Sequence, residues 1–263
     1  MDVKRIIVVK LGGSVLDSKD TIVHDVVALQ KEGRPVVLVH GGAAMVTHWL
    51  AEQGIESRFY QGERITDAKS LEVVTAVLAG LANKETTAAI LQAGGRAVGI
   101  SGVDGALIQG KVRNAQLGYL GDVVRVNPAP LEALLLAGFI PVVAPVSLYV
   151  EGRTGKDPLL LNINGDTVAG EIAAAVAAQA LIFLTDMDGI HDGAGRLLTR
   201  LSPEETERML DSGVASGGMI PKLRACLTAS RAGTACYIVD GRQPHAIAGA
   251  LSGEHCGTIV RRE

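Results

Sequence analysis

The chain has 263 residues, of which 48% are hydrophobic and 3% aromatic, and a formal net charge of −3. A chain of this length buries roughly 75% of its unfolded surface, as one large domain or two small ones, and the core must here consist of Val, Ile, Leu and Ala. The small negative charge provides no basic surface, which argues against nucleic acid or an anionic membrane as the main partner.

The first predicted element is a strand over residues 5–9, where four consecutive β-branched residues indicate burial on both faces. Residues 10–13 (Lys-Leu-Gly-Gly) follow at its end. An apolar run over residues 35–39 repeats this pattern and leads into residues 40–43 (His-Gly-Gly-Ala). Ligands of open α/β sheets bind at the carboxyl ends of parallel strands, so we expect one crevice with two facing glycine-rich loops and a lysine already in it.

Predicted helices and strands alternate through the first part of the chain, which indicates parallel strands with helices on both faces. Apolar spacing, capping residues and glycine stops predict helices over residues 21–31, 43–53, 68–81, 83–93 and 127–138. Strands are expected over residues 96–102 and 139–145, short antiparallel segments over 107–111 and 121–126, and an exposed hairpin over 59–66. The polar stretch 149–158 is the expected boundary between an N-terminal lobe, about residues 1–150, and a C-terminal lobe, about residues 159–263.

The second part of the chain continues the alternation. The predicted elements are a helix over residues 168–178, a buried strand over 180–185, a capped helix over 203–211, a helix over 222–232 and strands over 236–239 and 258–260. Gly155-Lys156 does not form a phosphate-binding loop, because Val150 occupies the position of the required glycine. The Gly-Ala-Gly run at 193–195 predicts a tight hairpin turn, since Leu198 replaces the third glycine of a dinucleotide fingerprint.

Other features predict a reduced protein without a membrane segment. Cys226, Cys236 and Cys256 are widely spaced and include no C-x-x-C pair, so we expect reduced apolar core residues and neither disulfides nor a zinc site. Lys10 interrupts the N-terminal apolar run too early for a signal peptide, and the tract 167–184 contains a glutamate and a glutamine. We therefore expect a cytoplasmic protein.

Two lysines and one aspartate carry the predicted chemistry. Phosphoryl transfer requires cations and N–H dipoles around a group whose negative charge is spread over several oxygens. Lys10 and Lys222 each adjoin glycines at a predicted strand–helix junction, and Asp166 between them would hold both ammonium groups, each contact being worth about 4 kcal/mol before desolvation. From the residues alone, a phosphate-handling site is favoured, while a capping and packing role for the glycines and a nicotinamide or flavin site stay open.

The order of six runs resembles the amino-acid kinase family. The runs are KLGGS at 10–14, HGG at 40–42, GERITD at 62–67, NINGD at 162–166, LTDMDG at 184–189 and GGMIPK at 217–222. The resemblance implies one domain with two lobes, built as a three-layer α/β/α sandwich around a mainly parallel sheet. It also implies transfer of the γ-phosphoryl group of ATP to the γ-carboxylate of N-acetyl-L-glutamate for arginine synthesis.

The resemblance implies roles for three groups of residues. Lys10 and Lys222 would stabilise the charge on the transferred phosphoryl group, with Asp166 orienting both. The acceptor would be bound by Gly41, Gly42, Ala43, Arg64 and Asn162, with Arg64 as a bidentate clamp on its α-carboxylate. The nucleotide would be bound by Gly12, Gly13, Asp186, Met187, Asp188, Gly189, Ile190, His191, Val214, Ala215 and Ser216. Mg²⁺ would be held by ATP phosphates and water, without protein side chains. No general base is required, because the attacking carboxylate is already ionised.

Two departures from the family pattern concern the acceptor side. Ala43 replaces a third glycine, and Glu63 stands where a hydrophobic residue such as Leu is common. A kinase acting on aminoadipate attached to a carrier protein is therefore an alternative, although no cluster of basic residues surrounds Arg58 and Arg64; a catalytically silent nucleotide or metabolite sensor is another. The first strand begins near Met1, which leaves no room for the extra N-terminal helix of arginine-inhibited hexamers, so we expect a homodimer without arginine feedback. His40 is expected to be a hydrogen-bonded structural residue.

Overall fold

The computed structural model describes residues 6–13, 19–60, 62–215, 217–253 and 257–262. Its helical segments are α1 (Lys19–Lys31), α2 (Ala43–Glu52), α3 (Ala68–Thr75), the π-helical η3 (Ala76–Ala82), α4 (Asn83–Gln92), the short 3₁₀ turns η4 (Asp104–Ala106) and η5 (Ala115–Leu117), α5 (Ala129–Leu136), α6 (Gly165–Ala175), α7 (Pro203–Asp211), α8 (Met219–Arg231) and α9 (Ala246–Ser252).

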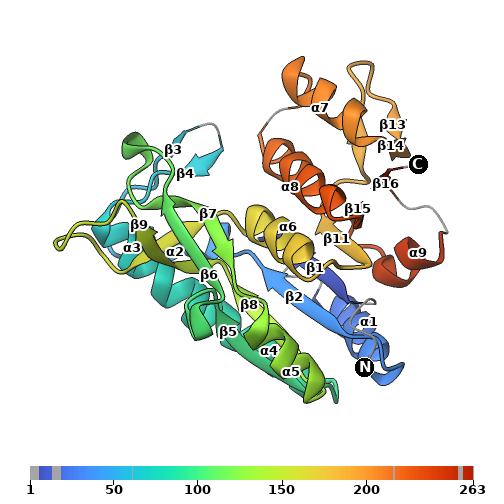
Figure 1. Ribbon diagram of the computed structural model, residues 1–263, viewed down its shortest axis with the longest axis horizontal. Helices are drawn as coiled ribbons and strands as arrows, with labels where there is room; N and C mark the ends of the chain where they lie inside the picture. Colours follow the sequence, from blue (N-terminus) through green and yellow to red (C-terminus); the bar gives the residue numbers. More distant parts are fainter. Residues whose placement is uncertain (1–5, 14–18, 61, 216, 254–256, 263) are drawn as a thin grey trace.

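The central sheet contains strands from near both ends of the described chain (Figure 1). Its strands are β1 (Ile7–Leu11), β2 (Val36–His40), β5 (Ala97–Ser101), β8 (Ile140–Ala144), β11 (Ala180–Thr185), β14 (Arg200–Leu201), β15 (Ala235–Asp240) and β16 (Thr258–Val260). The order is β14-β16-β15-β11-β1-β2-β8-β5, and the neighbours from β15 to β5 are all parallel. β16 runs antiparallel to β15, and the edge strand β14 pairs with β16 in parallel.

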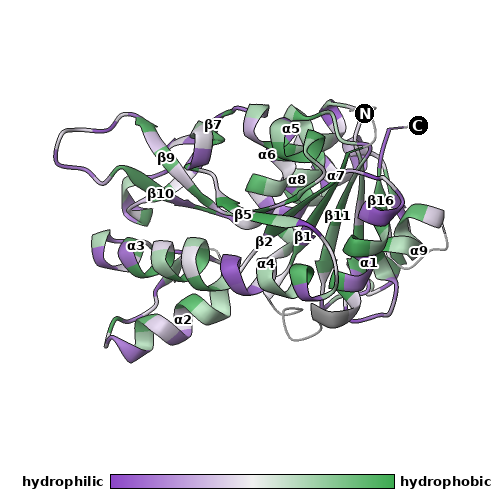
Figure 2. Cartoon of the chain, turned by 90° about the horizontal axis from the view of Figure 1, so that it is seen from below, coloured by the Kyte–Doolittle hydropathy of each residue, from purple (hydrophilic) through white to green (hydrophobic). Residues whose placement is uncertain are grey.

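Helices cover both faces of this sheet (Figure 2). Apolar residues of α5, α6 and α8 form one core cluster with the first face, and those of α1, α4 and α9 form a second cluster with the opposite face. The strands β1, β2 and β11 are buried along their whole length, as expected from their uninterrupted apolar runs. The expected α/β/α architecture with a mainly parallel sheet is confirmed. Among the described residues, no helix is long and apolar enough to cross a membrane.

Smaller β elements surround the carboxyl edge of the sheet. The strands β6 (Ile108–Val112), β7 (Leu120–Val126), β9 (Val146–Glu151) and β10 (Leu160–Ile163) form a closed barrel, and β3 (Phe59–Tyr60) with β4 (Glu63–Arg64) and β12 (Ile190–His191) with β13 (Leu197–Leu198) form two antiparallel ribbons. The polar stretch 149–158 lies at the end of β9 and in its connection to β10. The central sheet contains strands from before and after this stretch, so the division into two lobes stays a prediction.

The structure shifts three helix starts in ways that matter for the site. The predicted break before Asn83 is absent, because Ala82 and Asn83 keep right-handed helical dihedrals and the helix runs on through η3 into α4. α6 begins at Gly165, where the Asn164 side chain accepts hydrogen bonds from the Asp166 and Thr167 amides. α8 begins at Met219. The acidic residue and the lysine of the two motifs therefore lie in first helical turns.

Candidate active site

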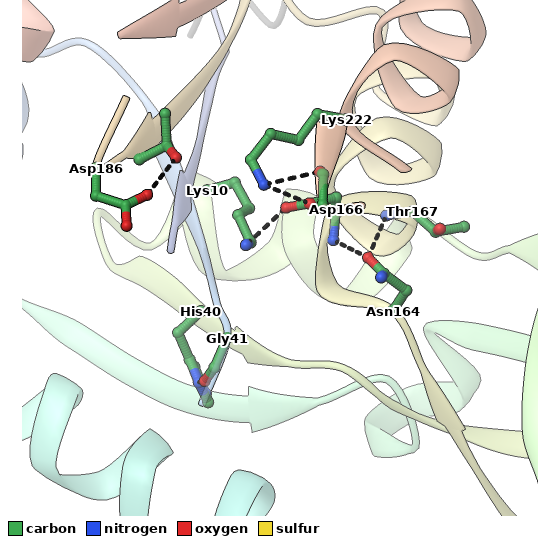
Figure 3. Close-up of polar contacts among 10 residues, drawn as sticks. Lys10, His40, Gly41, Asn164, Asp166, Thr167, Asp186 and Lys222 are labelled. Carbon is green, nitrogen blue, oxygen red and sulfur yellow. Dashed lines mark hydrogen bonds and ion pairs between the residues drawn. The ribbon is translucent and has the colours of Figure 1, made fainter. Parts of the chain in front are cut away.

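One carboxylate connects two lysines that are 212 positions apart, or 222 minus 10, in the chain (Figure 3). Lys10 extends from β1, Asp166 from the first turn of α6, and Lys222 from the first turn of α8. Lys10 Nζ lies 2.6 Å from Asp166 Oδ1, and Lys222 Nζ lies 3.1 Å from Asp166 Oδ2. Lys222 also donates to the Gly218 carbonyl at 3.2 Å. The predicted convergence of these three residues is present in the structure.

Burial and charge act in opposite directions on Asp166. Its 4% exposure raises the pKa of the carboxyl by desolvation, but the Lys10 and Lys222 ammonium groups outweigh burial and hold the pKa below its ordinary value. The aspartate is therefore ionised at neutral pH. Two cations with one anion between them leave a net positive charge, which suits a polyanionic ligand such as a nucleotide phosphate.

The helices that carry Asp166 and Lys222 are packed at close range. A Cβ at Gly170 of α6 would lie 2.8 Å from the Cα of Ala225 in α8, so glycine permits this approach. Asn164 caps α6 and fixes the first turn, where the helix dipole favours an acidic side chain. Local capping and close helix packing together determine the separation of the aspartate and the lysine.

Arg64 forms the second cationic centre of the site. Its guanidinium donates to the Ser57 hydroxyl at 2.7 Å, to the Thr47 hydroxyl at 2.7 Å and to the Ala43 carbonyl at 3.0 Å, and lies 4.7 Å from the ring centre of Phe59. The residue is 7% exposed, and this burial lowers the pKa of the guanidinium. The ion pairs formed by the described residues include no acidic partner for Arg64. A fixed, buried cation held by neutral groups is suited to an incoming carboxylate.

Asn162 supports Arg64 through a threonine. Asn162 Nδ2 donates to the Thr66 hydroxyl at 3.1 Å, and this hydroxyl donates to the Arg64 carbonyl at 3.1 Å. Thr66 is also bound through its backbone to Leu117 and Tyr119. Sequence reasoning missed Thr47, Ser57 and Thr66 as supporting residues, since no fixed spacing relates them to Arg64.

The glycine-rich loop after β2 lies opposite Lys10. His40 is buried, its Nδ1 lies 2.8 Å from the Gly41 carbonyl and its Nε2 lies 3.2 Å from Asn83 Nδ2, which fits the structural role expected for it. Gly42 has a φ of 150°, and a Cβ there would lie 2.7 Å from Leu78 Cδ2. Ala43 is exposed at the start of α2. This loop, Lys10, Asp166 and Arg64 border one cavity of about 230 Å³, which Gly13, Asn162 and Gly218 also line.

The residues expected around the nucleotide follow β1, follow β11 or lie between α7 and α8, and they differ in exposure. Asp186, Met187 and Asp188 are exposed, and His191 Nε2 lies 3.4 Å from Asp188 Oδ1. Val214 is 43% exposed. Ile190 is buried at 2% exposure, and its amide donates to the Thr258 hydroxyl.

The other nucleotide assignments are constrained by backbone geometry and packing. Gly189 has a φ of 144°, and a Cβ there would lie 2.6 Å from Leu197 Cδ1, which explains the need for glycine. The Ala215 side chain belongs to the core, and Ser216 lies outside the described residues. The Gly12 amide donates to the Leu184 carbonyl at 3.0 Å, so in this structure its N–H serves the sheet and not the phosphate contact expected for it.

Comparison with known proteins gives consistent matches over the chain. A model of the amino acid kinase family matches residues 5–240. Acetylglutamate kinase of Dehalococcoides mccartyi is 51% identical over 256 residues, covering 97% of this chain and 94% of that protein. Acetylglutamate kinase of Dinoroseobacter shibae is 43% identical over 262 residues, covering 98% and 89%. The crystal structure of smu.665 from Streptococcus mutans shares the fold, with a TM-score of 0.81 at 24% identity over 99% of this chain and 100% of that one.

Proposed function

The chain belongs to the amino acid kinase family, and from this premise we propose that it transfers the γ-phosphoryl group of ATP to the γ-carboxylate of N-acetyl-L-glutamate. The product is an acyl phosphate used in arginine biosynthesis. The observation that carries the proposal is one cavity bordered by Lys10, Asp166 and Arg64, with Lys222 paired to the same Asp166 carboxylate. The names of the relatives agree with this substrate.

In the proposed reaction the acceptor α-carboxylate binds Arg64, and its γ-carboxylate points toward the lysines. A carboxylate oxygen forms a bond to the γ-phosphorus while the bond from that phosphorus to the bridging oxygen breaks, and ADP leaves with the electron pair. No proton is transferred, because the nucleophile is already an anion. Lys10 and Lys222 stabilise the charge on the transferred group, and Asp166 keeps both ammonium groups in place.

We propose that the donor enters as its Mg²⁺ complex, with the ion held by phosphate oxygens and water. Both oxygens of Asp166 already contact ammonium groups, so this carboxylate is not available as a simple metal ligand. Asp186, Met187, Asp188 and Val214 are proposed to border the nucleotide, since they are exposed beyond the carboxyl end of β11 and before α8.

A coupled assay of ADP formation tests the proposal. N-acetyl-L-glutamate should support ADP release and yield an acyl phosphate that hydroxylamine traps, whereas aminoadipate, free or attached to a carrier protein, should not. ADP formation only with the carrier-bound substrate would identify the alternative kinase, and ADP formation with no acceptor would refute both.

Lys222→Ala should lower kcat by roughly 100-fold or more, because a cation facing the transferred group is lost. The fold should be retained, since Lys222 lies in the first turn of α8 and not in the core. Lys156→Ala, in an exposed loop, is the matched control. Equal kcat values for Lys222→Ala and the wild type would contradict the assigned role.

We further propose a homodimer in the cytoplasm. Leu81 and Leu91, 37% and 51% exposed on the continuous helix from α3 to α4, are apolar side chains that such an interface would cover. Light scattering with and without arginine tests the oligomeric state, and cell fractionation tests the location. A monomer at all concentrations would contradict the dimer.

A further inference from the structure

Glu63 and Arg64 are neighbours on β4, but their side chains bind different groups. Consecutive side chains of a strand point to opposite faces, so the two charges lie on different sides of the β3–β4 ribbon. Arg64 binds Ser57, Thr47 and the Ala43 carbonyl. The Glu63 carboxylate instead pairs with the guanidinium of Arg113, which follows β6. The acceptor-binding ribbon is therefore held from both faces.

Arg113 also binds a second carboxylate. Its Nε lies 2.6 Å from Asp122 Oδ1 on β7, while its other edge faces Glu63. The side chains of Glu63 and Arg113 are 17% and 21% exposed, so this pair is largely shielded from water. Burial lowers the pKa of Arg113, but the two carboxylates outweigh burial and raise it, so the guanidinium stays charged.

Glu63 lines the acceptor cavity as well as a smaller one of about 70 Å³, which Arg113, Pro221 and Arg224 also border. Next to Glu63, at the tip of the ribbon, a Cβ on Gly62 would lie 3.7 Å from Gly217. Glu63 borders the cavity in which an anionic acceptor is expected, so an uncompensated charge on it would repel that acceptor.

We propose that Arg113 is a positioning residue of the acceptor site, which neutralises Glu63 and so allows this cavity to take an anionic acceptor. The inference rests on the proposed function, since it assumes that the acceptor is a carboxylate. Asp122 fixes the orientation of Arg113, and Arg113 keeps the charge of Glu63 from opposing the attraction exerted by Arg64.

A double-mutant cycle on the full chain tests this inference with N-acetyl-L-glutamate as the acceptor. Arg113→Met should raise the KM for the acceptor by about tenfold while leaving the KM for ATP within about twofold, because it leaves Glu63 charged and unpaired. Glu63→Leu should leave the acceptor KM unchanged or lower it. The acceptor KM of the double variant should return to within about threefold of the value for Glu63→Leu, because the opposing charge is gone.

Added salt provides a readout that a purely structural role would not move. The effect of Arg113→Met on the acceptor KM should shrink as ionic strength rises, since it arises from an uncompensated charge. Lys111→Met is the matched control, because Lys111 lies on β6 and pairs with Glu151 at 3.2 Å on the exposed surface of the same barrel. This control should leave both KM values unchanged.

Two outcomes would overturn the inference. One is the same rise in acceptor KM for Arg113→Met with and without Glu63→Leu, and the other is an equal rise in the KM values for ATP and the acceptor. Both require an active wild type, so they are distinct from failure of the proposed function, which a wild type inactive with N-acetyl-L-glutamate would show. In that event, thermal unfolding still tests the pair, since Arg113→Met should lower Tm and the double variant should restore it.

Discussion

Asp166 illustrates how one buried residue can serve both stability and chemistry. Removing one partner from a buried ionic cluster is destabilising, because the remaining charges lose their compensation. In this protein the remaining charges would be the two ammonium groups of Lys10 and Lys222, now close together without an anion. The same carboxylate lines the cavity and holds both cations, so stability and function depend on it.

Asp166→Asn should lower the free energy of unfolding by about 3 kcal/mol at neutral pH. Lys10 and Lys222 hold the pKa of Asp166 below its ordinary value in spite of burial. The carboxylate therefore contributes its full stabilisation above the pKa of the unfolded state, and this stabilisation is lost as pH falls through the pKa of the folded state. The difference in unfolding free energy between the wild type and Asp166→Asn should therefore be constant near neutral pH and shrink below about pH 4. Urea titrations over this range measure it, and a difference that grows in acid would contradict the assignment.

Arg64→Ala should raise the KM for the acceptor by about tenfold or more and change kcat less, because the guanidinium binds a part of the acceptor remote from the reacting oxygen. Arg64→Lys should recover little of this loss, since an ammonium group cannot reproduce the fixed geometry with Ser57 and Thr47. Arg58→Ala is the control, since Arg58 is 59% exposed in its side chain. Steady-state kinetics with varied acceptor distinguishes these results from a loss of kcat.

At the scale of elements, the contact between α6 and α8 determines the site. Asp166 and Lys222 lie in the first turns of these helices, and the missing side chain at Gly170 lets α6 pack directly against Ala225 of α8. The sequence indicated a helix in each place from apolar spacing, but it contained no information on their separation. Packing of one glycine against another helix decides whether the ammonium group reaches the carboxylate.

Gly170→Ala should lower both stability and kcat. The new Cβ would lie 2.8 Å from Ala225, so the helices must move apart, at a cost of about 1 to 3 kcal/mol in unfolding free energy. The same movement draws Lys222 away from Asp166. Gly80→Ala is the matched helical control, since a Cβ there meets nothing within 4 Å, and it should leave activity unchanged. A fully active Gly170→Ala variant would show that the two helices tolerate displacement.

At the scale of the whole molecule, one continuous sheet connects the acceptor and nucleotide sides. β1 lies between β2 and β11 and pairs with each in parallel over its length, so strands from both parts of the chain share backbone hydrogen bonds. The cavity lies at the carboxyl edge of this sheet, where Lys10 lies in the last part of β1 and the loop of Gly41 follows β2. Both proposed substrates therefore bind at the edge of the same sheet. Movement of the acceptor side relative to the nucleotide side requires this sheet to bend or twist.

The protein should unfold in a single cooperative step because the shared sheet couples its two parts. Its one tryptophan, Trp49, lies in α2 and reports on the acceptor side, whereas far-UV circular dichroism reports on all helices and strands. The two signals should follow the same urea curve. Separate transitions would show that the acceptor side unfolds independently, and would support a stronger division into lobes than the sheet order suggests.

The sequence by itself determined the buried strands, most helices and the group of Lys10, Asp166 and Lys222, because apolar periodicity, capping and glycine positions act over a few residues and the family motifs retain their order. It also indicated Arg64, but not its support. Only the tertiary structure decided that Thr47, Ser57 and Ala43 hold this arginine, that Gly12 serves the sheet, and that Arg113 compensates Glu63. These contacts join residues far apart in the chain, and their geometry arises only when the elements pack, for which no local spacing gives a signal.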